Sequence, residues 1–143
     1  MAKNTIKVRD YLHVVEEFPA QSAITPGMLV EITSDKEVKP HSVEGGAAPI
    51  MFANEDEFQG KTIEDAYAQG ALVQCWLPQR GDIAYGILDD GEDVTTGDVL
   101  ISAGNGKLKA QDSSEGTPIG IALESVDMTV SEPPSGRILV LIV

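Results

Sequence analysis

Apolar residues in this chain occur in short runs that are separated by residues typical of turns. Many runs are rich in β-branched residues or alternate between apolar and polar positions, which is typical of strands. Glycine, proline, asparagine and aspartate fill the segments between them. The pattern predicts strands over residues 11–15, 28–33, 47–53, 71–77, 83–88, 98–102, 107–111, 118–126 and 137–143. We therefore expect a mainly β fold, a small barrel or sandwich built from meanders.

Two local signals mark the ends of predicted strands. Pro19 ends the first strand, because proline offers no N–H to a neighbouring strand. Gly104-Asn105-Gly106 is the clearest hairpin turn, since each of these residues tolerates a left-handed backbone. This turn would join the strands over residues 98–102 and 107–111.

One short helix is predicted over residues 63–68. Thr62 can cap its free N–H groups, Asp65 follows three residues later, and Gly70 supplies a stop. A helix of about two turns is marginal by itself. We expect its apolar side chains to hold it against a sheet, namely Ile63, Ala66 and Tyr67.

The last predicted strand, over residues 138–143, contains no charged residue. Such a run needs burial on both faces, which either a central strand or a subunit interface can supply. We therefore assign its alternate residues to the core or to a subunit contact: Ile138, Val140 and Ile142.

Length and composition indicate a single β-rich domain. The chain has 143 residues, of which 42% are hydrophobic, with 14 glycines and 8 prolines. This size fits one domain, and the frequent turns argue against a helical bundle, while the apolar content excludes a disordered chain. A single cysteine fits a reducing compartment, and no apolar run reaches the ~20 residues of a membrane span.

Charge is strongly negative overall but unevenly distributed. The net charge of −13 argues against direct binding to nucleic acid or to an anionic membrane. Lys3, Lys7 and Arg9 nevertheless lie in a start that contains no acid. This basic segment is either an interaction arm or an ordinary solvated terminus. We divide the chain into an arm, residues 1–19, and a β-rich body, residues 20–143.

No catalytic site can be assembled from the sequence. His13 and His41 lack a second histidine at metal-ligand spacing, and Cys75 lies in an apolar strand where cysteine usually behaves as a small buried hydrophobe. No serine, Ser102 included, lies in a nucleophile-elbow motif, and no glycine-rich phosphate loop precedes a helix. We expect no enzymatic activity and no cofactor.

Two acidic segments are interpreted as solvated turns. Asp89-Asp90-Gly91-Glu92-Asp93 could in principle surround a hard cation, but its spacing is not that of an EF-hand. Glu55-Asp56-Glu57 is interpreted as an exposed loop and not as a general acid–base pair. We therefore predict no metal site.

One longer motif resembles a known family. The segment over residues 49–70 is similar to a string in tailed-phage capsid decoration proteins, also called cementing or head-stabilising proteins, in which a β-rich second half follows. The matching positions are Ala53, Glu55, Gly60, Lys61, Ile63, Ala66, Tyr67 and Gly70. The downstream order of glycines and apolar residues, from Gly91 to Glu124, is similar too.

This resemblance implies a structural role in a virion. It implies a body of β-tulip or β-clip type, a homotrimer at three-fold axes of the head, and a clamp between major capsid subunits after the shell expands. The protein would be made in the host cytoplasm and end on the capsid exterior. Under this interpretation the N-terminal arm is partly mobile in the free protein. It binds the capsid through Lys3, Ile6, Lys7, Val8, Arg9, Tyr11 and Leu12.

A second resemblance keeps an alternative function open. Residues 91–100 are similar to a motif of biotinyl and lipoyl carrier domains, which present one modified lysine at a hairpin tip. Here Lys107 follows the turn Gly104-Asn105-Gly106, but the residues that flank a carrier lysine are missing.

Overall fold

The computed structural model describes residues 2–47, 49–131 and 135–143, and it confirms a mainly β protein with several antiparallel sheets. Within these ranges the helical content is one 3-10 turn, η1 (Glu57–Gln59). No helix there is long and apolar enough to cross a membrane. The strands are β1 (Lys7–Arg9), β2 (Val15–Pro19), β3 (Val30–Ile32), β4 (Val38–Pro40), β5 (Phe52–Ala53), β6 (Leu72–Trp76), β7 (Ile83–Ile87), β8 (Asp93–Val94), β9 (Val99–Ser102), β10 (Leu108–Ala110), β11 (Gly120–Ala122), β12 (Val126–Asp127) and β13 (Arg137–Ile142).

The largest sheet has six strands in the order β1-β7-β13-β11-β9-β10. Its longest strand, β13, is central and pairs antiparallel with β7 and with β11. Ile138, Val140 and Ile142 are at most 2% exposed within this single chain. These three residues lie in the larger core cluster of the single chain. Their proposed part in a trimer contact stays a prediction.

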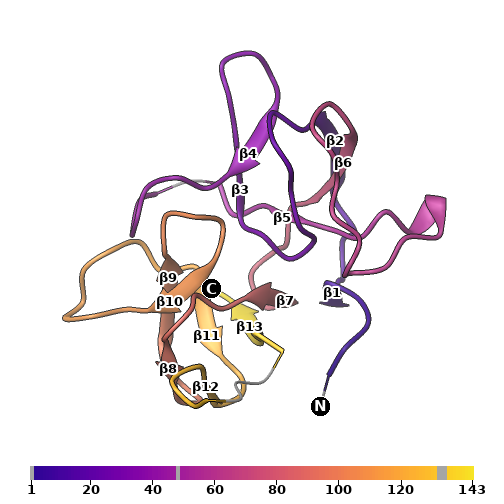
Figure 1. Cartoon of the computed structure of the whole chain (residues 1–143). Coiled ribbons are helices and arrows are strands. Elements are labelled where there is room, and N and C mark those ends of the chain that lie inside the picture. Colours follow the sequence, from indigo (N-terminus) through magenta and orange to yellow (C-terminus); the bar gives the residue numbers. More distant parts are fainter. Residues whose placement is uncertain (1, 48, 132–134) are drawn as a thin grey trace.

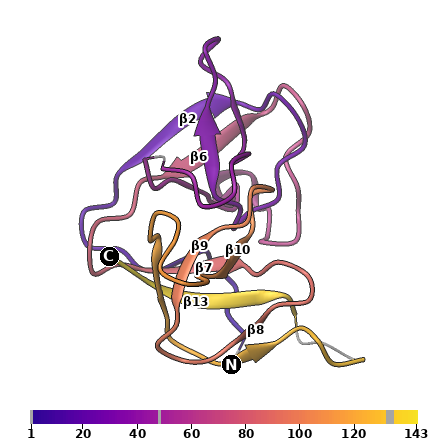
Figure 2. The same cartoon turned by 90° about the vertical axis from the view of Figure 1, so that its left-hand side faces the viewer.

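Two smaller sheets form a second tier. The order β2-β6-β5 gives a three-stranded sheet, and β3 pairs with β4 beside it. Both views show this tier above the six-stranded sheet, with the β8–β12 pair at the opposite end (Figures 1 and 2). Two apolar clusters form the core. The larger one contains Trp76 of β6 and Ile138 of β13 and so joins the two tiers, and the smaller one lies around Ile24 and Val73.

The predicted helix over residues 63–68 is wrong. The carboxylate of Asp65 does accept the N–H of Thr62 at 2.7 Å, but this contact closes a turn and no helix follows. Tyr67 instead forms a β-bridge with Ile24, with N···O distances of 2.7 and 3.1 Å. Pairing with a distant extended segment satisfies the same backbone groups that a helix would use. A two-turn helix is only marginally stable, so it does not compete with this pairing.

The first predicted strand begins too early. Residues 11–14 form a turn in which His13 has a φ of 53°, and β2 runs from Val15 through Pro19. Proline is accommodated there because β2 is an edge strand with β6 on one side only.

Two other predicted strands are shorter than expected. The segment over residues 47–53 contains only β5, and its residue Ala48 lies outside the described part of the chain. The segment over residues 118–126 is split by a turn into β11 and the first residue of β12. The hairpin at Gly104-Asn105-Gly106 is confirmed, with Ser102 paired to Leu108 across it.

Candidate partner-binding surface

The N-terminal segment is fastened to the body. Ile6 is fully buried in the larger core cluster, and its backbone C=O accepts the N–H of Tyr85 at 2.9 Å. Beyond it, Lys7 pairs with Ala84 as β1 joins the edge of the six-stranded sheet. Residues 6–9 are thus part of the body's sheet and do not extend as a detached arm.

Glu55 anchors the start of this segment. Its carboxylate accepts the hydroxyl of Thr5 at 2.5 Å and the backbone N–H of Ile6 at 3.1 Å. Glu55 is only 5% exposed, so its interpretation as part of an exposed loop is wrong. A signal for burial was present, because Glu55 stands two residues after the apolar run that ends at Ala53.

A turn after β1 presents two apolar side chains to solvent. Tyr11 is 74% exposed and Leu12 is 67% exposed. The turn is held by Asp10, which accepts the backbone N–H of His13 at 2.8 Å, and by the buried Asp82, which accepts the N–H of Tyr11 at 3.4 Å. Burial raises the pKa of Asp10, but the hydrogen bonds from His13 outweigh it and hold this pKa below its ordinary value.

The structure separates the seven residues predicted to contact a capsid. Arg9, Tyr11 and Leu12 are exposed, whereas Ile6 is in the core. Three others are partly buried: Lys3, Lys7 and Val8. The exposed residues are the most accessible to a partner, and the contact of all seven residues with a capsid stays a prediction.

A shallow pocket of about 240 Å³ lies beside this turn. Four of its lining residues are Lys7, His13, Glu57 and Phe58. The Lys7 Nζ atom is 3.4 Å from a Glu57 carboxylate oxygen and 3.5 Å from His13 Nδ1. The remaining lining comes from the sheet β2-β6-β5 and its surroundings, through Val15, Glu17, Asn54 and Gln74. Sequence reasoning did not find this pocket, because its residues come from four separate segments.

Phe58 is the most exposed large apolar residue in the described part of the chain, at 80%. It lies in η1, which projects from the side of the molecule (Figure 1). No residue of this turn is buried. An aromatic side chain held in solvent at a pocket rim is typical of a contact surface.

A buried Ser–His–Glu arrangement lies elsewhere in the fold. His41 Nδ1 is 2.6 Å from Ser102 Oγ, and His41 Nε2 is 3.9 Å from a Glu31 carboxylate oxygen. Ser102 has no exposed surface, and its Oγ also accepts the N–H of Gly104 at 3.1 Å. A nucleophile must reach its substrate, so this arrangement holds the hairpin at residues 104–106 and does not form an active site.

The acidic turn over residues 89–93 is engaged by protein donors. Asp89 accepts the side-chain amide of Asn105 at 3.0 Å, and Asp90 lies 3.5 Å from Lys107. Among the residues that the structure describes, no group of three or more His, Cys, Asp or Glu side chains could hold a metal ion. The absence of a bound metal in the native protein stays a prediction.

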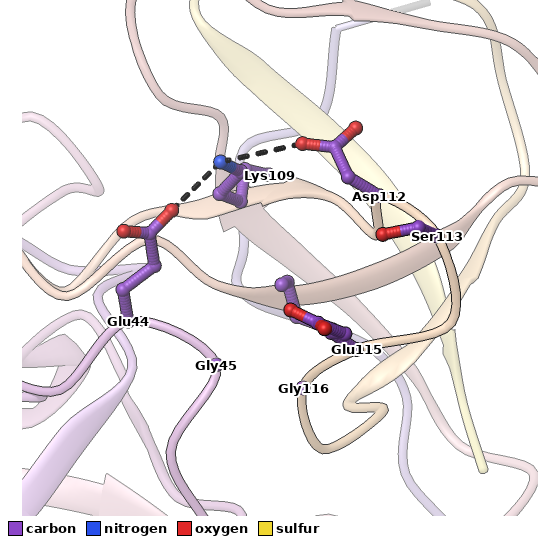
Figure 3. Close-up of a pocket in the computed structure, with 8 residues that line it drawn as sticks. Glu44, Gly45, Lys109, Asp112, Ser113, Glu115 and Gly116 are labelled. Carbon is purple, nitrogen blue, oxygen red and sulfur yellow. Dashed lines mark hydrogen bonds and ion pairs between the residues drawn. The ribbon is translucent and has the colours of Figure 1, made fainter.

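Another pocket, of about 410 Å³, has carboxylates around one lysine (Figure 3). Lys109 Nζ lies 2.7 Å from Glu44 and 3.8 Å from Asp112. The hydrogen bond that Lys109 donates to Glu44 raises the pKa of Lys109, so Lys109 keeps its charge and cannot serve as a base near neutral pH. The arrangement is an ion-pair cluster on the surface.

Comparison with protein-family models finds no match, and comparison with curated proteins finds none. The fold does have a match among solved structures, the crystal structure of the head fiber gp8.5 N base in bacteriophage phi29. The TM-score is 0.61 at 18% sequence identity, over 92% of this chain and 95% of that chain. The chain thus has the fold of a phage head fiber base over almost its full length.

Proposed function

We propose that this protein is a structural component of a phage head that attaches to the capsid surface. The observation that carries the proposal is the fold match to a head fiber base, because it extends over almost all of both chains. The motif over residues 49–70 supports the same class of protein independently of the fold. In this role the protein acts through contacts and has no catalytic function.

We further propose that the protein has a cementing role on the head. A homotrimer on the outer surface of the head would bridge neighbouring major capsid subunits and add contacts that must break before the subunits separate. Such a bridge needs exposed contact groups on a stable body. Tyr11 and Leu12 on a fastened turn and Phe58 on η1 supply groups of this kind.

The geometry of the hairpin at residues 104–106 disfavours a biotinyl or lipoyl carrier. The C=O of Gly106 accepts the N–H of Leu29 at 2.8 Å, and its N–H donates to the C=O of His41 at 3.1 Å. Lys107 follows this turn, and its Nζ atom is 3.5 Å from Asp90. A carrier lysine must project freely from its hairpin, whereas this turn is packed against the body.

Electron microscopy of heads tests the proposal. Heads of the phage that encodes this chain, assembled without the protein, are compared before and after the purified protein is added. We expect added density on the outer surface at three-fold positions. On heating, heads with the protein should release their DNA at a higher temperature than heads without it. Heads that gain neither density nor heat resistance would contradict the proposed function.

Light scattering tests the trimer separately. The expected mass in solution or on release from heads is three times the 15.2 kDa of one chain. A mass of one chain at all concentrations, together with isolated single copies on heads, would contradict the trimer and leave attachment to the head intact.

A further inference from the structure

Strand β2 has an unpaired edge. It is the outermost strand of the order β2-β6-β5. The C=O of Val14 accepts the N–H of Leu77 at 2.9 Å, and the N–H of Ala20 donates to the C=O of Ala71 at 2.8 Å. Successive residues of an antiparallel strand direct their backbone groups alternately to the two sides. The even-numbered residues of this segment therefore face β6, and the odd-numbered ones face outward.

The outward groups belong to Val15 and Glu17. Within the described ranges, neither backbone N–H has a partner on this side. A parallel bridge between Ala20 and Val38 covers the end of the strand beyond Pro19. The open portion thus offers two N–H and two C=O groups, which is the pattern that an added strand recognises.

The pocket described above lies on the sheet face next to this edge. The side chains of Val15 and Glu17 line it, so the open edge and the pocket are contributed by the same two residues. Glu17 forms no ion pair with any residue in the described parts of the chain. A second carboxylate, that of Glu57, also lines the pocket and lies 3.4 Å from Lys7 Nζ.

Asn54, which lines the pocket, carries a buried acceptor that lacks a donor. Asn54 is 2% exposed, and its Oδ1 has no hydrogen-bond partner among the described residues. Its orientation is set by its Nδ2, which donates to the C=O of Glu55 at 3.2 Å. A buried polar atom without a partner is destabilising, and most buried polar atoms in native proteins pair with a protein group or an ordered water. The missing group here is a hydrogen-bond donor.

We propose that the β2 edge and this pocket together bind an extended segment of a partner protein that carries a lysine or arginine. The segment adds a strand beside Val15–Glu17, and its cationic side chain enters the pocket between Glu17 and Glu57. Its N–H groups supply the donors that these carboxylates and Asn54 accept, and Phe58 at the rim covers the aliphatic stem. The proposal rests on the proposed function, in that the partner is a protein of the head surface.

A second copy of β2 is a poor occupant of the same edge. Two such strands would bring Glu16 and Glu17 of one copy against the same acids of the other, and like charges across a strand pair are destabilising. The net charge of −13 adds to this repulsion. The same charges attract a basic segment, so charge selects a different protein as the partner.

The test uses a matched pair of charge reversals on β2 and purified heads that lack the protein. Glu17→Lys places a cation in the pocket, whereas Glu16→Lys makes the same change of net charge at the neighbouring position, which does not line the pocket. We expect Glu17→Lys to weaken binding to heads at least tenfold and Glu16→Lys to change it less than twofold. Glu17→Pro removes one outward N–H, which β6 does not use, and is expected to weaken binding at least tenfold as well.

Hydrogen–deuterium exchange with fragmentation gives a second readout that requires no variant. The amides of Val15 and Glu17 should exchange rapidly in the free protein and at least tenfold more slowly on heads. If the protein binds heads while these amides stay unprotected and the two charge reversals bind equally, the inference is overturned and the proposed function stands. If the unchanged protein does not bind heads at all, the proposed function fails and this inference fails with it.

Discussion

The carboxylate of Glu55 holds the backbone N–H of Ile6, 49 residues away in the sequence, at 3.1 Å. The same carboxylate holds the hydroxyl of Thr5. Both carboxylate oxygens of Glu55 therefore accept hydrogen bonds. They do so at the point where the chain enters the core, because Ile6 itself is fully buried. The motif that resembles phage decoration proteins therefore contains the residue that fixes the N-terminal segment in place.

Removal of this anchor should loosen the N-terminal segment. Glu55→Ala leaves the N–H of Ile6 without an acceptor in a buried site, so we expect a loss of about 1–3 kcal/mol in the free energy of unfolding. Glu55→Gln retains an acceptor oxygen and should lose less. Urea denaturation measures both losses, and hydrogen exchange at Ile6 should accelerate in the alanine variant. Equal stability of both variants with the parent would contradict an anchoring role.

Truncation should separate the free start of the chain from the fastened part. Deleting residues 2–4 leaves Thr5, Ile6 and β1 in place, and the thermal melt should stay within about 2 °C of the parent. Deleting residues 2–9 removes Ile6 from the core and an edge strand from the sheet, so we expect a loss of about 3 kcal/mol or more. A thermal melt that is unchanged by the longer deletion would restore the interpretation of a detached arm.

The longer strands of the six-stranded sheet, β7, β9 and β13, were predictable because their burial is local in origin. Residues 138–143 form an uncharged run, and the structure places most of that run in the central strand β13. The turn at residues 104–106 was predictable for a similar reason, because both of its glycines have positive φ, at 87° and 80°. Apolar pattern and backbone chemistry act within a few residues, and both are visible in the sequence.

The surface features were not predictable, because they depend on contacts between distant segments. Thr62 and Asp65 form the contact expected at the start of a helix, yet Tyr67 pairs with Ile24 in a β-bridge instead. Glu55 and Arg137 are charged and buried, and only their distant partners explain why. The pocket beside β2 likewise requires four segments to meet. Its open edge could not be identified from the sequence because the pattern does not fix strand order.

Arg137 should be one of the most sensitive positions in the fold. Its guanidinium donates to the C=O of Pro26 at 2.8 Å and to the C=O of Ile63 at 2.9 Å, and lies over the ring of Tyr85. Arg137→Met leaves two carbonyls without donors, and we expect a loss of roughly 2–4 kcal/mol. Arg137→Lys should lose less stability than Arg137→Met but remain less stable than the parent, because a single ammonium lacks the planar array of N–H donors of the guanidinium. Chemical denaturation tests this, and a loss below about 0.5 kcal/mol for the methionine variant would contradict it.

Glu31 should contribute stability that disappears in acid. Burial raises its pKa, but hydrogen bonds from Ser42 and Lys39 lower it by more, so the folded-state pKa lies below the ordinary value. A lowered carboxyl pKa contributes stability above the unfolded-state pKa, and this is lost as the pH falls through the folded-state value. Glu31→Gln should therefore cost up to about 1 kcal/mol near pH 7 and progressively less below about pH 4.5. Urea denaturation at several pH values measures it, with Glu16→Gln as an exposed control whose effect should be small throughout.

Cys75 should be chemically inert while the protein is folded. It is fully buried in β6, and this burial raises the pKa of its thiol to about 12. The thiolate is the reactive form of cysteine. Near pH 8 the thiolate fraction of folded Cys75 is smaller than that of an unfolded cysteine, and this difference alone should slow alkylation by roughly 10³-fold. Iodoacetamide labelling followed by mass spectrometry should show almost no adduct in buffer and complete modification in guanidinium chloride. Because the folded state disfavours the thiolate, stability should also fall as the pH rises above about 9, and Cys75→Ala should lack this alkaline loss. Rapid labelling of the folded protein would show that β6 opens readily, and the three-stranded sheet would then be too labile to present the edge of β2 to a partner.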